Sequence, residues 1–408
     1  MTAGHLASRV ALAAVFAIVA GCGSGVPSLR PGSATTPTVA TTPTENPTVA
    51  PTDPPPTRAP WTLFPAYPTA TLDGATAGKL QAILDDLVSG GYPDAVAAVV
   101  TADGTWAGAA GIDGPDGRLA DPSDMFNIAS VSKPILAALV LRLAQDGKVD
   151  LDAPLANYLD EVPVVANGAT VRQALQMRAG YGDTPASAAE ASSADCRRVW
   201  SRADTLVSLP ETATKPGGIF RYSNPSYKLL GYAAEEVSGM PLDAAFDEQL
   251  FGPLGLDRIL LQTADRKTPK PWAVPIGKYG GGLDLDAFGT GGTLPCVSLS
   301  TFSFSTSAVA SDAPSLARWA WGLFAGELID RSALEQMTTP FDGGHAMGIE
   351  LLPDFRPNLA YGVHGGNAGY AAFLTVLPER QAVAVVFVNF QEAEVQGAAR
   401  DLLLALAK

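Results

Sequence analysis

Strand-like segments stand near both ends of the apolar-patterned part of this 408-residue chain, with helix-like segments between them. Residues 93–102 and 105–111 flank an Asp-Gly pair that is typical of a hairpin turn. Residues 373–377 and 382–390 flank a second short turn. Helices are predicted at 72–88 and 393–407. We therefore predict an α/β protein of the α+β type. Its antiparallel sheet, built from both ends of the chain, is flanked by helices, and a mainly helical subdomain, about residues 140–300, is inserted.

The chain's only Ser-x-x-Lys motif is Ser130-Val131-Ser132-Lys133, and an apolar run with helical spacing follows it. Positions i and i+3 of a helix share one face, so the spacing directs the Ser130 hydroxyl and the Lys133 amine to one point. Serine becomes an effective nucleophile when a neighbouring base takes its proton, and Lys133 can be that base. The alternative interpretation is a capping serine followed by a solvated lysine.

A second motif, Tyr222-Ser223-Asn224, is the chain's only Tyr-x-Asn. In an extended segment, residues i and i+2 point to the same side, so a hydroxyl and an amide would enter one cleft. Tyr222 could relay a proton, and Asn224 could hold Lys133 or a substrate amide. The same residues also predict a helix start, with Asn224 as N-cap and Pro225 at the first helical position.

A third motif, His364-Gly365-Gly366-Asn367, precedes the second pair of predicted strands. Glycines beside a strand edge let a ligand approach the backbone closely, and such an edge can direct an N–H group at a developing oxyanion. The alternative is an ordinary loop without a role in chemistry.

In this order, the three motifs resemble those of the serine acyl-transferases that include class C β-lactamases, D,D-peptidases and related esterases. The resemblance covers about residues 75–405, most clearly 126–133, 151–155, 170–175 and 216–256. It implies a β-lactamase/transpeptidase-like fold with a site between the sheet and the helical subdomain. The resemblance also implies that Ser130 is the nucleophile, that Lys133 and Tyr222 share the roles of base and acid, and that Asn224 orients them. It implies that His364 takes the place of a strand lysine and that Gly366 and Asn367 lie near the substrate. The backbone N–H groups of Ser130 and Asn367 would form the oxyanion hole.

Two features depart from the family pattern and bear on the substrate. Gly365 has no hydroxyl where relatives often carry threonine, and His364 offers an imidazole where many relatives carry a lysine ammonium. We therefore expect weak recognition of substrate carboxylates, poor β-lactam hydrolysis and measurable cleavage of short-chain esters. Gly365→Thr is expected to restore carboxylate recognition, and Arg178 is the first candidate for a replacement carboxylate ligand.

Residues 1–22 resemble a lipoprotein signal peptide that ends in a lipobox cysteine, Cys22. Residues 23–70, rich in Pro, Thr and Ala, are predicted to be a disordered linker, and residues 71–408 the hydrolase domain. We expect a lipid-anchored protein on the outer face of the cell membrane. The alternative is a plain secretory peptide with an incidental cysteine.

The remaining features restrict cofactors and partners. Cys196 and Cys296 are predicted to form a disulfide or to be two free buried thiols, and no pattern suggests a metal or a cofactor. The formal net charge of −14 argues against nucleic acid as partner. We expect a monomer, a small-molecule or peptidoglycan-derived substrate, and His345 in a solvent-facing loop.

Three functions follow from these observations. The first is a serine acyl hydrolase that forms a covalent acyl-enzyme on a peptide, amide or ester of the cell envelope. The second is a D-alanyl-D-alanine carboxypeptidase (a penicillin-binding protein) or a weak β-lactamase. The third is a catalytically silent wall-binding lipoprotein, which the complete set of Ser130, Lys133, Tyr222 and Asn224 disfavours.

Overall fold

The computed structural model describes residues 61–406, apart from 160–161, 211–212, 276–284, 342–343 and 356–358. The chain divides into two units, Met1–Arg58 and Ala59–Lys408, and every described residue belongs to the second. The predicted signal peptide, Cys22 and the linker up to residue 60 lie outside the described residues. Within the described ranges, no helix is long and apolar enough to cross a membrane.

The central sheet has seven antiparallel strands in the order β3-β2-β1-β10-β9-β8-β7. Strand β1 pairs with β10, so the two ends of the domain meet in one sheet, which confirms the predicted architecture. The strands are β1 (Asp94–Thr101), β2 (Gly104–Asp113), β3 (Arg118–Leu119), β7 (Glu350–Leu351), β8 (Tyr361–Asn367), β9 (Tyr370–Leu377) and β10 (Ala382–Val388).

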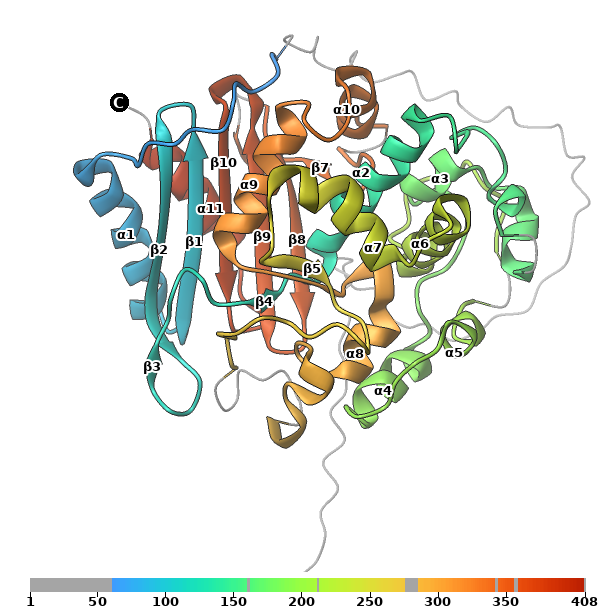
Figure 1. Ribbon diagram of the computed structural model, residues 1–408, viewed down its shortest axis with the longest axis horizontal. Helices are drawn as coiled ribbons and strands as arrows, with labels where there is room; N and C mark the ends of the chain where they lie inside the picture. Colours follow the sequence, from blue (N-terminus) through green and yellow to red (C-terminus); the bar gives the residue numbers. More distant parts are fainter. Residues whose placement is uncertain are drawn as a thin grey trace, which may run out of the picture. The chain divides into compact units, whose positions relative to one another are not determined.

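Helices cover both faces of the sheet (Figure 1). On one face lie α1 (Gly74–Ser89) and α11 (Gln396–Ala405), and on the other lie α9 (Ala313–Phe324) and α2 (Ser132–Gln145). Successive residues of β1 therefore enter different cores. Ala95, Ala97 and Val99 pack under α1 and α11, while Val96, Ala98 and Val100 pack on the other side. Burial on both faces explains why the central strands are continuously apolar rather than alternating.

The inserted region is mainly helical, as predicted, and one small sheet that was not predicted joins it to the segments on either side. Strands β4 (Phe126–Asn127), β6 (Val309–Ser311) and β5 (Ile259–Leu261) form this sheet. Strands of two or three residues are too short for a period-2 pattern to show in the sequence. The helices of this region are α3 (Val171–Leu175), α4 (Ala186–Ala194), α5 (Arg202–Val207), α6 (Asn224–Ser238), α7 (Leu242–Phe246) and α8 (Val297–Ser303), and α10 (Arg331–Thr338) follows α9.

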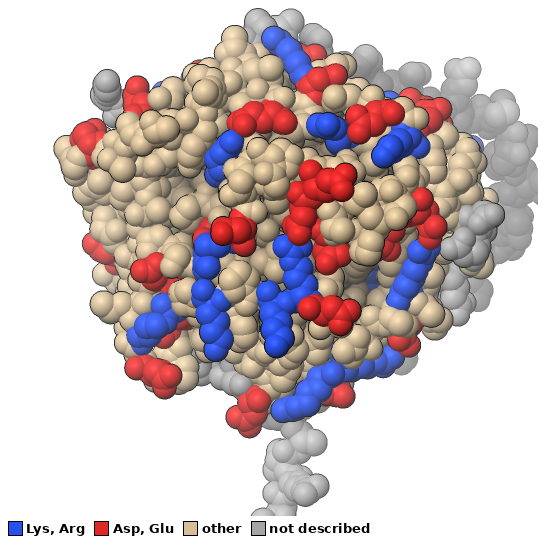
Figure 2. Space-filling model, viewed as in Figure 1, with Lys and Arg blue, Asp and Glu red and all other residues tan. Residues whose placement is uncertain are grey.

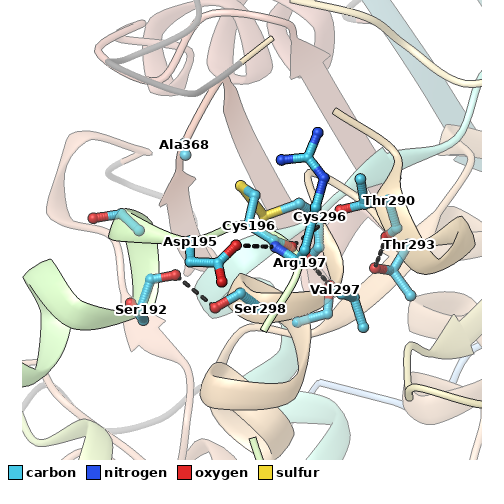
Figure 3. Close-up of a disulfide and its surroundings, with 12 residues drawn as sticks. Ser192, Asp195, Cys196, Arg197, Thr290, Thr293, Cys296, Val297, Ser298 and Ala368 are labelled. Carbon is cyan, nitrogen blue, oxygen red and sulfur yellow. Dashed lines mark hydrogen bonds between the residues drawn. A yellow bond between two sulfur atoms is a disulfide. The ribbon is translucent and has the colours of Figure 1, made fainter. Parts of the chain in front are cut away.

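A disulfide joins Cys196, between α4 and α5, to Cys296 at the start of α8, which decides between the two alternatives left open by the sequence. The two cysteines are 100 residues apart in the chain. Figure 3 shows the bond among short polar contacts, including one from Ser298 Oγ to Ser192 O at 2.7 Å. The disulfide thus attaches the α4–α5 segment to α8.

The domain begins earlier than residue 71. Trp61 and Phe64 are buried, and Phe64 packs edge-on against Trp321 of α9 at a ring distance of 4.7 Å. The Phe64 amide donates to Phe324 O at 3.0 Å, and the Trp321 indole donates to Pro65 O, also at 3.0 Å. Isolated aromatic residues in a Pro-rich stretch carry no periodic signal, so the sequence assigned them to the linker.

Charged side chains of both signs are interspersed on the face shown in Figure 2. Several arginines of the domain pair directly with carboxylates, among them Arg258 with Asp312 at 2.7 Å and Arg266 with Asp247 at 2.8 Å. These pairs compensate part of the acidic charge locally, while the net excess of acidic over basic residues remains.

Lys228 of α6 is a buried lysine, with 2% of its surface exposed. Its ammonium group lies over the Phe302 ring of α8, 4.1 Å from the ring centroid. Burial lowers the pKa of Lys228 to about 7, because removal from water disfavours the charged form. Lys228 therefore makes the folded state less stable wherever the amine is protonated in the unfolded chain, which is below about pH 10.5.

The sign of the pH dependence follows from linkage. Between about pH 7 and 10.5, the unfolded chain holds a proton on Lys228 that the folded chain has released, so stability rises with pH across this window. Lys228→Met should raise the free energy of unfolding near pH 6 by on the order of a few kcal/mol, and this gain should shrink towards pH 10. Urea denaturation at several pH values measures it, with exposed Lys148→Met as control. A Lys228→Met variant that is less stable than wild type near pH 6 would contradict the prediction.

Candidate active site

Ser130 lies in a 3₁₀ turn (Ala129–Val131) that leads directly into α2. Its Oγ atom has two polar neighbours. Lys133 Nζ donates a hydrogen bond to it at 2.9 Å, and the hydroxyl of Tyr222 lies 2.7 Å away. The structure therefore brings together the two motifs that the sequence singled out at residues 130–133 and 222–224.

Lys133 is held deep in the site, with 2% of its surface exposed. A second hydrogen bond, to Thr306 O at 3.1 Å, orients its amine, and the amine also lies 4.9 Å from the centre of the Tyr222 ring. Tyr222 itself is 43% exposed and faces the cleft. A buried amine and an accessible phenol thus converge on one hydroxyl, which is the geometry that general acid–base catalysis at Ser130 requires.

The turn around Ser130 is stabilised by the side chain of Asn127. This buried amide donates to Leu294 O at 3.1 Å and to Ser307 O at 3.0 Å, and its carbonyl accepts from Ala129 N at 2.9 Å. Ala129 adopts a positive φ of 48°, which few residues other than glycine tolerate without support. The Asn127 contacts hold this unfavourable conformation just before the nucleophile.

Ser132, the other serine of the motif, has a structural position. Its hydroxyl donates to Ala129 O at 2.7 Å and accepts from Val309 N at 3.1 Å, and the side chain is fully buried. These bonds tie the start of α2 to β6. Ser132 is therefore withdrawn from the cleft, and Ser130 is the serine of this motif that lines it.

The second motif differs in one detail from its sequence interpretation. Ser223, not Asn224, is the N-cap of α6, because the Ser223 hydroxyl accepts from Ser226 N at 3.2 Å and Asn224 is the first helical residue. Asn224 Nδ2 donates to Asp183 Oδ1 at 3.1 Å rather than contacting Lys133. Asn224 Oδ1 is buried and accepts no hydrogen bond from the described residues. Contact with a substrate amide stays a prediction for that oxygen.

The third motif lies on β8, which is the second strand from this edge of the sheet, next to the short edge strand β7. Its residues point alternately to the two faces of the sheet. His364 and Gly366 line the cleft, whereas Gly365 faces the turn that carries Ser130. A β carbon at Gly365 would overlap Ile128 O and lie 3.1 Å from Ser130 N. The expectation that a threonine hydroxyl at 365 would reach a substrate carboxylate is therefore wrong for this chain, because that side chain would be directed at the backbone of Ile128 and Ser130.

Asn367 completes this part of the site. Its Nδ2 donates to Asn127 Oδ1 at 3.3 Å, so the end of β8 is linked to the nucleophile turn. The predicted oxyanion hole needs the backbone N–H groups of Ser130 and Asn367 near one point. The contact through Asn127 keeps the two segments adjacent, and the oxyanion hole itself stays a prediction.

The opposite wall of the cleft contains residues that the sequence did not identify. Phe220 stacks on His345 with ring centroids 3.5 Å apart and an interplanar angle of 9°. His345 was predicted to face solvent in a loop, but it is partly buried and lines the cleft with Glu350. The cleft encloses about 290 Å³. No sequence motif marks His345 or Glu350, since only the fold brings residues 345–350 beside Ser130.

Arg178 does not serve the cleft as a carboxylate ligand. Its guanidinium donates to Gly217 O at 2.8 Å and to Gly218 O at 2.7 Å, and it lies over the Phe341 ring. Through these contacts, Arg178 stabilises the turn at residues 217–218. Arg178 is also absent from the described residues that line the cleft.

The described residues hold no group of three or more His, Cys, Asp or Glu side chains arranged for a metal ion.

The fold and the Ser130 geometry together define a serine hydrolase of the β-lactamase and penicillin-binding protein fold. Residues 80–408 match the Beta-lactamase family, and the chain belongs to that family. The sequence is 31% identical to the esterase EstB of Burkholderia gladioli over 51% of this chain and 57% of EstB. It is 30% identical to penicillin-binding protein 4 of Amycolatopsis lactamdurans over 32% of this chain and 35% of the relative.

Solved structures agree with this assignment at the level of the fold. The D-amino acid amidase of Ochrobactrum anthropi SV3, crystallised with L-phenylalanine, superposes with a TM-score of 0.70 at 21% identity. The match covers 82% of this chain and 98% of the amidase. The alignments with the two relatives named above span only 57% and 35% of the lengths of those proteins.

Because β8 approaches the Ser130 turn closely, alanine substitutions at two adjacent glycines should affect stability differently. Gly365→Ala should destabilise the protein by about 1–3 kcal/mol, because the new methyl group meets backbone atoms that cannot move independently. Gly366→Ala is the matched control, since its β carbon would meet Gln391 O and the His364 ring at 3.6 Å, an ordinary contact distance. Thermal denaturation compares the two variants. Equal melting temperatures would show that the turn is not packed against Gly365.

Proposed function

We propose that this serine hydrolase works through a covalent acyl-enzyme on Ser130 and cleaves small esters, amides or peptides. The observation that supports the proposal most strongly is the pair of short contacts from Lys133 and Tyr222 to Ser130 Oγ, at 2.9 and 2.7 Å. A silent binding protein of this fold would not need a buried lysine aligned on an accessible serine. The third of the functions considered above is therefore disfavoured.

In the proposed reaction, Ser130 Oγ attacks the substrate carbonyl while its proton passes to the Lys133–Tyr222 pair. The resulting oxyanion is stabilised by the backbone N–H groups of Ser130 and Asn367. Collapse of the tetrahedral intermediate breaks the scissile bond, and Tyr222 donates the proton to the leaving amine or alcohol. A water molecule then attacks the acyl-enzyme, with the same pair as base, and the free acid leaves as Ser130 regains its proton.

The residues that line the cleft favour substrates without a carboxylate over β-lactams and peptides that end in D-Ala-D-Ala. Arg178 is engaged with backbone carbonyls, and position 365 faces away from the cleft. The names of EstB and of the D-amino acid amidase support ester and amide substrates. The name of penicillin-binding protein 4 supports the alternative, a D-alanyl-D-alanine carboxypeptidase or weak β-lactamase.

Labelling with a fluorophosphonate tests the nucleophile. We expect a single adduct, which intact-mass spectrometry detects and peptide mapping places on Ser130. Tyr222→Phe and Lys133→Ala should each lower kcat for p-nitrophenyl butyrate by about 10²–10⁴-fold, with unchanged thermal stability in Tyr222→Phe. An adduct on another residue would refute the assignment of Ser130 as nucleophile. Efficient hydrolysis of a chromogenic cephalosporin with no hydrolysis of the ester would refute the preference for substrates without a carboxylate.

We further propose that the enzyme is held at the outer face of the cell membrane by diacylglycerol on Cys22, where a wall-derived substrate would be within reach. The support is the sequence of residues 1–22. Cys22→Ala should abolish incorporation of radiolabelled palmitate and release or mis-process the protein. Ser130→Ala leaves the lipobox intact and should incorporate palmitate like wild type. Unchanged labelling of Cys22→Ala would rule out this anchor.

A further inference from the structure

The cleft has one positively charged and one negatively charged side chain, and they differ in whether they are free to contact a substrate. Among the described residues that line it, Lys133 is the only lysine or arginine and Glu350 is the only carboxylate. The Lys133 amine is already bonded to Ser130 Oγ and Thr306 O. A negatively charged substrate group therefore meets no uncommitted lysine or arginine on these walls, whereas a positively charged group meets Glu350.

Glu350 has a defined position relative to the reacting centre. It lies opposite Gly362 in the antiparallel pair of β7 and β8, and His364 follows two residues further along β8. Alternate residues of a strand share a face, so Glu350 and His364 lie on the same face of this sheet edge. Both line the cleft that contains Ser130 and Tyr222.

The imidazole of His345 lies beside Glu350. Its Nε2 atom lies 3.9 Å from Glu350 Oε1, and its ring is stacked on Phe220. A backbone bridge also pairs residues 345 and 350. The Glu350 side chain is nevertheless 54% exposed, so one side of the carboxylate stays accessible from the cleft. An exposed carboxylate that is oriented by its neighbours can bind a ligand without first breaking a buried ion pair.

We propose that Glu350 binds the protonated amine of the substrate's acyl group, which makes aminoacyl amides, aminoacyl esters and peptides with a free N-terminal amine the preferred substrate class. This inference rests on the acyl-enzyme function proposed above and names its substrates. The cleft volume of about 290 Å³ lies at the lower end of ligand sites, and it suits an acyl group of the size of one amino acid. Glu350 is a specificity residue in this proposal and takes no part in bond breaking.

The alternative interpretation is that Glu350 is a solvated residue at the rim of the cleft. Exposed ion pairs are worth up to about 1 kcal/mol, which is roughly a fivefold effect on a rate ratio. Partial desolvation under a bound substrate strengthens the pair. We therefore expect an effect of about five- to tenfold, whereas a solvated glutamate that does not bind the substrate would leave the rate ratio unchanged.

The test compares alanine p-nitroanilide with isobutyryl p-nitroanilide, in which a methyl group replaces the ammonium. The ratio of their kcat/KM values is measured for wild type and for Glu350→Gln, with both enantiomers of alanine. The two anilides differ in the intrinsic reactivity of their carbonyl groups, but this difference is the same for both proteins and cancels when their ratios are compared. We expect Glu350→Gln to lower the ratio about five- to tenfold for the favoured enantiomer and to leave the isobutyryl rate unchanged.

Glu379→Gln is the matched control, since this exposed glutamate lies in the β9–β10 turn, at the end of β9 away from the cleft. It should retain the wild-type ratio. Fluorophosphonate labelling of each variant separates the two proposals. If Ser130 is labelled in Glu350→Gln and the ratio does not change, the role of Glu350 is refuted while the acyl-enzyme function stands. If wild type forms no adduct on Ser130 and cleaves neither anilide, the proposed function fails, and the inference fails with it.

Discussion

The side chain of Asn127 is the contact on which the geometry around Ser130 depends. All four hydrogen-bonding positions of this buried amide are used, by Leu294, Ser307, Ala129 and Asn367. These partners belong to four separate segments: the loop before α8, the loop before β6, the nucleophile turn and the end of β8. A buried amide that lost these partners would cost about 1–3 kcal/mol for each group left unsatisfied. The contacts therefore fix the nucleophile turn against both the sheet and the helical region.

The packing of β8 against that turn has consequences for the chemistry of the cleft. Because Gly365 approaches Ile128 and Ser130 so closely, β8 presents His364 and Gly366 to the substrate and no hydroxyl from position 365. Arg178 is used to hold a neighbouring turn. In the proposed reaction, the acyl group would therefore be selected mainly by the walls that Phe220, His345 and Glu350 contribute to the cleft. Members of one fold can in this way differ in substrate while the groups around the reacting serine stay similar.

Local patterns were sufficient wherever neighbours in the chain decide the structure. The i, i+3 spacing of Ser130 and Lys133 requires only a helix start, and the hairpin of β1 and β2 requires only the turn signal at 103–104. Prediction was less accurate where one local choice competes with another. Ser223 and Asn224 are both good capping residues, and the backbone selects Ser223. Residues 61–67 were assigned to the linker because their burial depends on α9, which lies more than 240 residues later in the chain.

The sequence by itself determined the class of the fold, the order of its elements, and the nucleophile segment with its amine one helical turn away. These properties depend on periodicity and on spacings of a few residues. Only the tertiary structure decided that Cys196 and Cys296 are bonded, that Asn224 contacts Asp183, and that His345 and Glu350 stand beside Ser130. Such contacts join segments from 41 to about 220 residues apart. Their geometry is set by how strands and helices pack in three dimensions, and the local pattern of a sequence does not encode it.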